Sequence, residues 1–116
     1  MAGILSNEIG KIVFSDEVVA NLAGLAAMEC YGIVGMASTK ATDGIVDLLK
    51  KENLSKGIKI TFQGGSLKID MFVIVEHGTT VATVATNVID TVKYKIEAMT
   101  GFVVDTVNVN IMGIRV

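Results

Sequence analysis

Residues 79–116 read TTVATVATNVIDTVKYKIEAMTGFVVDTVNVNIMGIRV, and this stretch decides the fold. Up to Met99 its apolar residues recur at steps of three and four, which is typical of an amphipathic helix. Met99-Thr100-Gly101 then ends the run, and beyond Phe102 apolar residues alternate with polar ones, as in a half-buried strand. The stretch therefore predicts a long helix followed by a strand. The positions that show it are Val81, Val84, Ala85, Val88, Ile89, Val92, Ile96 and Met99 in the helix and Val107, Val109 and Ile111 in the strand.

The first part of this stretch sets residue preference against pattern. Ten of the fourteen residues from 79 to 92 are β-branched, which favours a strand. Strict alternation fails there, however, because Val81, Thr83 and Asn87 would share one face. The helical spacing continues into residues 93–97, so we predict a helix that packing stabilises more than intrinsic preference does.

Before this stretch, residues 58–75 predict a β-hairpin, because apolar and polar residues alternate on both sides of a Gly64-Gly65 turn. One set of alternate positions in the second strand faces the core. The opposite set begins polar, but Phe72 and Ile74 interrupt it. These two side chains are either shielded by a neighbouring element or form a contact patch. The predicted core set is Leu67, Ile69, Met71, Val73 and Val75.

The N-terminal part predicts a helix from Asp16 to about Tyr31, with Ser15 as its N-cap and Gly32 as its end. Its apolar residues nearly encircle it, which is typical of a helix buried on more than one side. In a chain this small, the second side is a candidate subunit contact. The other elements expected here are a strand over 10–14, a short strand or extended turn over 33–36, and a short helix over 44–53 that Asp43 caps.

The expected fold is one two-layer α/β (α+β) domain over residues 1–116. Its mixed β-sheet contains the hairpin, and its two long helices pack on one face of the sheet. The sequence does not decide whether the last strand is central or at an edge. The other, open face of the sheet would carry Lys59, Thr61, Gln63, Lys68, Asp70, Phe72, Ile74, Thr106, Asn108 and Asn110.

Composition bears on partners and on location. The chain is 51% apolar and 19% charged, with a mean hydropathy of +0.58, which favours apolar surface reserved for another subunit. A net charge of −2 does not favour nucleic acid or an anionic membrane as the partner. The apolar run over 18–28 is too short to span a bilayer, and the first eleven residues show no secretory signal. We therefore expect a cytoplasmic protein without a transmembrane segment.

Residues that carry catalysis or bind metals are scarce. His77 is the single histidine and falls in an expected turn, and Cys30 has no second cysteine to pair with. No glycine-rich phosphate loop is present. We expect no catalytic residue, no cofactor and no metal site. Glu29 is expected near the C-terminus of the first helix, where the helix dipole disfavours an anion, so it needs a partner: backbone N–H groups, a lysine or another chain.

The string Gly32-Ile33-Val34-Gly35 matches the GxxG loop with which KH domains clamp a nucleic-acid backbone. Its two central residues are apolar and suit burial better than contact with phosphates. A KH-like nucleic-acid-binding domain is therefore the alternative function, and nucleic acid is not the expected partner.

Several strings, taken in order, resemble the bacterial alkaline shock protein family, also called envelope stress response proteins. The resemblance covers essentially the whole chain and is closest to the short stand-alone members of Gram-positive bacteria. The strings are Gly10-Lys11-Ile12, Ala26-Ala27-Met28-Glu29-Cys30-Tyr31-Gly32 with Val34-Gly35-Met36, Leu67-Lys68-Ile69-Asp70-Met71, Val92-Lys93-Tyr94, Met99-Thr100-Gly101, Val107-Asn108-Val109 and Gly113-Ile114-Arg115-Val116.

This resemblance implies a non-enzymatic cytoplasmic protein of cell-envelope homeostasis and alkaline stress. It also implies self-assembly, and peripheral attachment to the membrane through a membrane-anchored partner or contact with a fatty-acid kinase-like neighbour. Our leading hypothesis is a self-associating scaffold or interaction module, a homo-oligomer that docks on an envelope partner. The candidate residues of the partner interface are Glu29, Lys59, Phe72, Ile74, Asn108 and Asn110.

Overall fold

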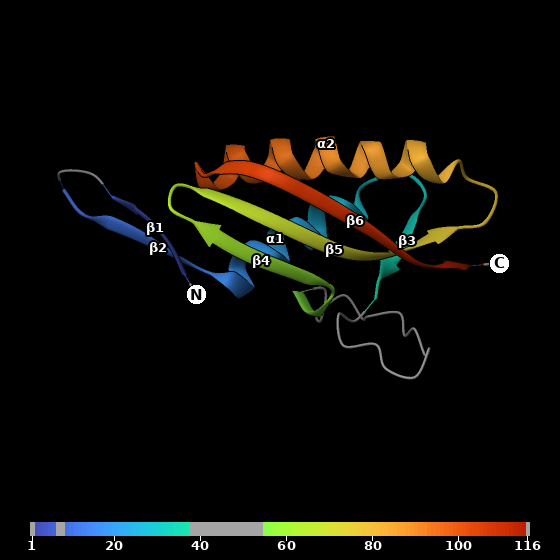
Figure 1. Ribbon diagram of the computed structural model, residues 1–116, viewed down its shortest axis with the longest axis horizontal. Helices are drawn as coiled ribbons and strands as arrows, with labels where there is room; N and C mark the ends of the chain where they lie inside the picture. The colour runs from blue at the N-terminus through green and yellow to red at the C-terminus, as the bar shows by residue number, and fades with distance from the viewer. Residues whose placement is uncertain (1, 7–8, 38–54, 116) are drawn as a thin grey trace.

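The computed structural model describes residues 2–6, 9–37 and 55–115 of the chain (Figure 1). The helix expected over 44–53 and its Asp43 cap lie outside the described residues. Mixed strand pairing and two helices confirm the predicted α+β class. In chain order the elements are β1 (Ala2–Ser6), β2 (Lys11–Ser15), α1 (Asp16–Met28), β3 (Ile33–Met36), β4 (Ile58–Gln63), β5 (Ser66–Glu76), α2 (Val81–Thr100) and β6 (Val103–Arg115).

Strand β5 is the centre of the main sheet. On one side it pairs in parallel with β6 along nearly its whole length. On the other side it pairs antiparallel with β4 through residues 66–71 and with β3 through residues 73–75. Within the described residues β6 pairs with no strand but β5, so the last strand lies at an edge of the sheet. Figure 1 shows β6, β5 and β4 side by side, with α2 running along β6.

The long helix is confirmed as α2, although ten of the fourteen residues over 79–92 favour a strand. Its core-facing residues repeat every four positions, at Val84, Val88, Val92 and Ile96, and all four are buried. Packing on the sheet therefore outweighs the β preference of the individual residues. The helix ends at Gly101, whose φ of 82° a residue with a side chain rarely adopts.

Helix α1 begins as predicted but ends earlier. The Ser15 hydroxyl accepts a hydrogen bond from the Val18 N–H at 3.2 Å, so Ser15 is the N-cap. The predicted end near Tyr31 is wrong, because the last helical residue is Met28 and Glu29 is the C-cap. Gly32 turns the chain toward β3 instead, with φ of 91° and Val84 so close that a Cβ would lie 2.6 Å from its Cγ2.

The core lies between the helices and one face of the sheet. Buried residues of β5, α2 and β4 form most of it, with smaller residues from α1. The predicted hairpin of β4 and β5 is confirmed, and Gly64 in its turn has φ of 64°. All five predicted core residues of β5 are fully buried: Leu67, Ile69, Met71, Val73 and Val75.

Strands β1 and β2 form a separate two-stranded sheet that projects from one end of the molecule (Figure 1). The predicted strand over 10–14 corresponds to β2, whereas β1 is an additional strand. Aromatic contacts fix the base of this hairpin: the Phe14 and Phe102 ring centroids are 5.4 Å apart, and Phe102 also packs on Phe62. Gly3 lies against these rings, where a Cβ would come within 2.2 Å of Phe62.

Candidate interaction surfaces

The strand register puts the predicted open-face residues on one side of the main sheet. Lys59 of β4, Asp70 of β5 and Asn108 of β6 form one row across three strands. The Asn108 side-chain amide donates a hydrogen bond to Asp70 Oδ1 at 2.8 Å. Lys59 and Asn108 are exposed, so this row is available to a partner in the isolated chain.

The apolar end of the open face is only partly accessible. Ile74 is 8% exposed, so for this residue the first of the two predicted alternatives, shielding within the chain, holds. Ile74 therefore offers little area to a partner. Phe72 is half-buried, and its register partner Asn110 donates a side-chain hydrogen bond to the Met71 carbonyl at 3.0 Å. Phe72 remains the accessible apolar side chain in the middle of this face.

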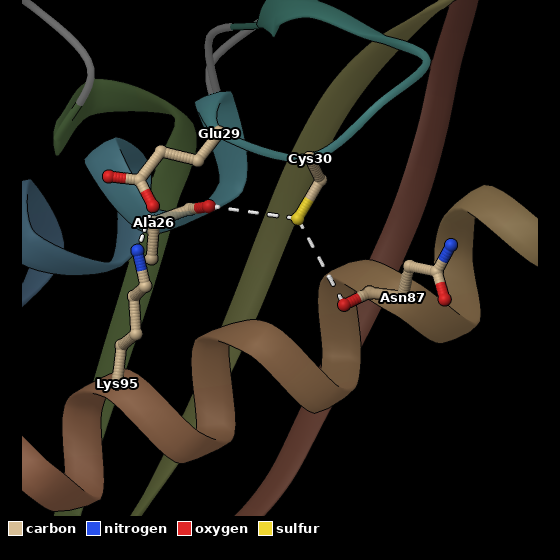
Figure 2. Close-up of polar contacts among 5 residues, drawn as sticks. All are labelled: Ala26, Glu29, Cys30, Asn87 and Lys95. Carbon is tan, nitrogen blue, oxygen red and sulfur yellow. Dashed lines mark hydrogen bonds and ion pairs between the residues drawn. The ribbon is translucent and has the colours of Figure 1, made fainter.

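Glu29 finds its partner within the chain. Its carboxylate forms an ion pair with Lys95 of α2, and Figure 2 shows the two side chains pointing toward each other. Of the three partners expected for Glu29, the structure selects a lysine. The Glu29 side chain is still 61% exposed, so the ion pair connects the end of α1 to α2 at the protein surface.

Cys30 follows Glu29 and is half-buried. Its thiol lies 3.7 Å from the Ala26 carbonyl and 3.9 Å from the Asn87 carbonyl, which is the geometry of weak sulfur hydrogen bonds (Figure 2). These contacts join the end of α1 to α2. Nothing beside the thiol in this geometry marks it as a nucleophile.

His77 lies in the predicted turn, after β5, and its backbone N–H donates to the Arg115 carbonyl at 2.9 Å. Among the described residues, no group of three or more histidine, cysteine, aspartate or glutamate side chains is placed to hold a metal ion.

The GxxG string does not form an exposed loop. Ile33 pairs with Val75 of β5, and Gly35 pairs with Ile74. Gly32 and Gly35 are buried. A KH-type clamp needs its two glycines in an accessible loop that can approach phosphates. The geometry therefore gives the KH-like alternative no support.

Two exposed apolar surfaces contain none of the candidate interface residues. On α1, Val18, Leu25 and Met28 are exposed at 48%, 44% and 37%, although the helix was expected to be buried on more than one side. On the N-terminal hairpin, Ile4 and Val13 are cross-strand neighbours and both are exposed. The all-round apolar character of residues 16–28 was the signal for the first surface. The second depends on the pairing of β1 with β2, and the sequence pattern did not predict β1.

In the part of the chain that the structure describes, no helix is both long and apolar enough to cross a membrane.

Comparison with known proteins identifies the family. Residues 5–116 match the alkaline shock protein 23 family, which is described by a cell envelope-related function. The uncharacterized protein YloU of Bacillus subtilis is 45% identical over 97% of this chain and 94% of its own length. The uncharacterized protein Spy1614 of Streptococcus pyogenes is 34% identical over 97% and 93%, and YqhY of Bacillus subtilis is 31% identical over 92% and 78%. No solved structure matches the chain. The chain thus belongs to the alkaline shock protein 23 family, whose function is related to the cell envelope.

Proposed function

We propose that this protein is a non-enzymatic scaffold of the cell envelope that acts by self-association and by docking on an envelope partner. The family's envelope-related function supports the setting. The observation that carries the proposal is the distribution of exposed apolar side chains. Eight of the twelve large apolar residues that are exposed in the described chain lie between residues 4 and 31. They are Ile4, Ile9, Ile12, Val13, Val18, Leu25, Met28 and Tyr31.

Such a cluster of exposed apolar residues favours association, because removing apolar surface from water contributes a favourable free energy of about 25 cal/mol per Å². Single exposed apolar residues are ordinary, but contiguous ones mark interaction sites. Ile4 and Val13 are paired neighbours, and Val18, Leu25 and Met28 are three residues of one 13-residue helix. The apolar surplus of the sequence is therefore gathered on the N-terminal hairpin and α1, where another subunit can cover it.

The open face is the proposed docking surface for the envelope partner. Its accessible side chains combine a cation, an aromatic ring and two amides, from Lys59, Phe72, Asn108 and Asn110. This mixture resembles the polar rim and aromatic centre of many transient interfaces. The partner classes that the family resemblance suggests are a membrane-anchored protein, which would hold this chain at the membrane periphery, and a fatty-acid kinase-like protein.

The first experiment is light-scattering mass on a sizing column, over a hundredfold range of protein concentration, at neutral and alkaline pH. A defined oligomer, or one that grows with concentration, is the expected result. A strict monomer throughout would overturn self-association and assign the exposed apolar surface to a different protein.

The open face is tested by Phe72→Lys, which adds a charge to the middle of the docking surface. We expect the free energy of unfolding to stay within about 1 kcal/mol of that of the unchanged protein, because the ring is only half-buried. Association through the open face should weaken. Gln63→Lys is the matched control, since Gln63 lies at the exposed end of the same face. Unchanged assembly and unchanged partner capture by the Phe72→Lys protein would exclude the open face as a contact.

A further inference from the structure

The outer edge of β6 is long and weakly protected. The strand has 13 residues, contains no proline and carries only two charged side chains, Asp105 and Arg115. Natural edge strands are usually short or are blocked by lysines, proline or bulges, because their free N–H and C=O groups can pair with another chain. Near its start, the Val104 N–H donates to the Glu97 carboxylate at 3.0 Å, so α2 closes the beginning of the strand.

Two irregularities delimit the part of the edge that is suited to pairing. The register between β5 and β6 shifts once between Leu67 and Lys68 and again between Val73 and Ile74. These shifts leave Asp105 and Met112 as the extra residues in β6. Between them, residues 106–111 follow β5 one for one. The regular edge is therefore a stretch of alternating polar and apolar residues with no charge in it.

The apolar layer remains partly open along this edge. Val109 and Ile111 face the core beside Met71 and Val73 of β5. The two β5 residues are fully buried, whereas Val109 and Ile111 are only half-buried. A strand added beside β6 would complete their burial, provided that it presents apolar residues at matching positions.

The same segment of a second copy satisfies that condition in an antiparallel arrangement. With a two-fold axis beside Val109, Val109 faces itself, Val107 faces Ile111 of the second copy, and Asn108 faces its Asn110. Each pair joins residues of the same face, as the pleat requires. The polar row and the apolar row thus both match.

Charge selects the direction of this pairing. Asp105 and Arg115 lie at opposite ends of β6, so an antiparallel partner brings Asp105 of one copy near Arg115 of the other, twice by symmetry. A parallel partner would bring each charge near its like. We propose that two copies of this chain pair antiparallel through the outer edges of β6, about a two-fold axis beside Val109, to form one continuous sheet. The inference rests on the proposed self-association and adds a second surface, the edge of β6, to the one on the N-terminal hairpin and α1.

The decisive test is site-specific cross-linking in a Cys30→Ala background, which removes the native thiol. Opposite residues of an antiparallel pair are close enough for a disulfide, so Val109→Cys should give a covalent dimer in a glutathione buffer. Thr83→Cys, exposed on α2, is the matched control and should link far less. A protein that dimerises by light scattering while Val109→Cys stays unlinked overturns the β6 pairing and leaves self-association standing. A monomer at all concentrations overturns both.

A charge exchange tests the direction without touching the apolar row. Asp105→Arg alone, or Arg115→Asp alone, should raise the dimer dissociation constant by about twofold to thirtyfold at low salt, because two exposed pairs become like-charged. The double exchange should restore the original constant. Weakening by each single change without rescue by the double one contradicts the antiparallel arrangement, as does the absence of any effect.

Discussion

The two helices use apolar residues in opposite ways. Helix α2 turns the periodic stripe of Val88, Val92 and Ile96 to the core and leaves mostly polar residues outside, with Tyr94 and Met99 as exposed exceptions. Helix α1 buries small residues and exposes Val18, Leu25 and Met28. Its buried residues are Val19, Ala20, Ala23, Gly24, Ala26 and Ala27.

The difference follows from how closely each helix approaches its neighbours. Alanine and glycine let α1 pack tightly against α2 and β4, since little side chain stands between the backbones. Val19 is the one larger residue of α1 that is fully buried, and Val18, Leu25 and Met28 lie on the other side. A periodic apolar stripe thus indicates the buried side of α2, whereas in α1 the apolar residues identify a second surface that the isolated chain leaves in water.

The largest difference in stability between the two helices should come from truncating one large side chain on each of them. Ile96→Ala removes a fully buried side chain of α2 and should lower the free energy of unfolding by about 2–5 kcal/mol. Leu25→Ala removes an exposed side chain of α1 and should cost less than about 1 kcal/mol. Urea unfolding at low protein concentration measures both. Equal losses would mean that α1 buries its large residues as α2 does.

Tight packing of α1 predicts that an enlarged side chain is tolerated poorly there. Ala23 is fully buried, so Ala23→Leu should cost about 1–3 kcal/mol through overpacking. Ala82→Leu, the same change at an exposed position of α2, is the control and should stay within about 0.5 kcal/mol. Thermal unfolding of both proteins decides the matter, and a neutral Ala23→Leu would show that α1 is loosely packed.

The ion pair between the helices is expected to contribute little. Glu29→Gln removes the charge that faces Lys95 and should lower stability by about 0–1 kcal/mol, less in high salt, because the Glu29 carboxylate is exposed to water. A double-mutant cycle with Lys95→Met isolates the coupling. Asp90→Asn, at an exposed position of α2, controls for the loss of a negative charge. A coupling well above this range would indicate that the pair is shielded from water.

The smallest effect on stability should accompany a clear effect on assembly. Leu25→Gln keeps a side chain of similar length on the exposed side of α1 and should leave the free energy of unfolding within about 0.5 kcal/mol. The dissociation constant of the oligomer should nevertheless rise, since a polar group replaces apolar contact area. Thr83→Gln on the exposed side of α2 is the control. Identical mass profiles for the two variants would remove α1 from the proposed contact.

Residue spacing within short stretches of sequence predicted the elements in which the apolar pattern runs without a break. Helix α2, the β4–β5 hairpin and the Ser15 cap all follow from spacing or from residues within a few positions of one another. The end of α1 was misjudged because residues compatible with a helix continue to Cys30, whereas Gly32 lies against Val84 of α2, a contact that only the tertiary structure reveals. Strand β1 depends on its pairing with β2.

For the candidate surfaces, alternation was sufficient to predict which residues share the open face, since strand side chains repeat every two positions. It did not reveal that Ile74 is shielded or that Glu29 pairs with Lys95 across 66 positions of sequence. Both depend on which elements become neighbours.

The sequence by itself determined the kinds of element in the C-terminal half, the core face of β5 and the surplus of apolar residues, because these depend on periodicity and composition. Only the tertiary structure decided that β6 pairs in parallel with β5 at the edge of the sheet, and that the large residues of α1 face outward. Pairing and facing are relations between segments far apart in the chain. Their energies depend on how closely backbones approach, which local pattern does not specify.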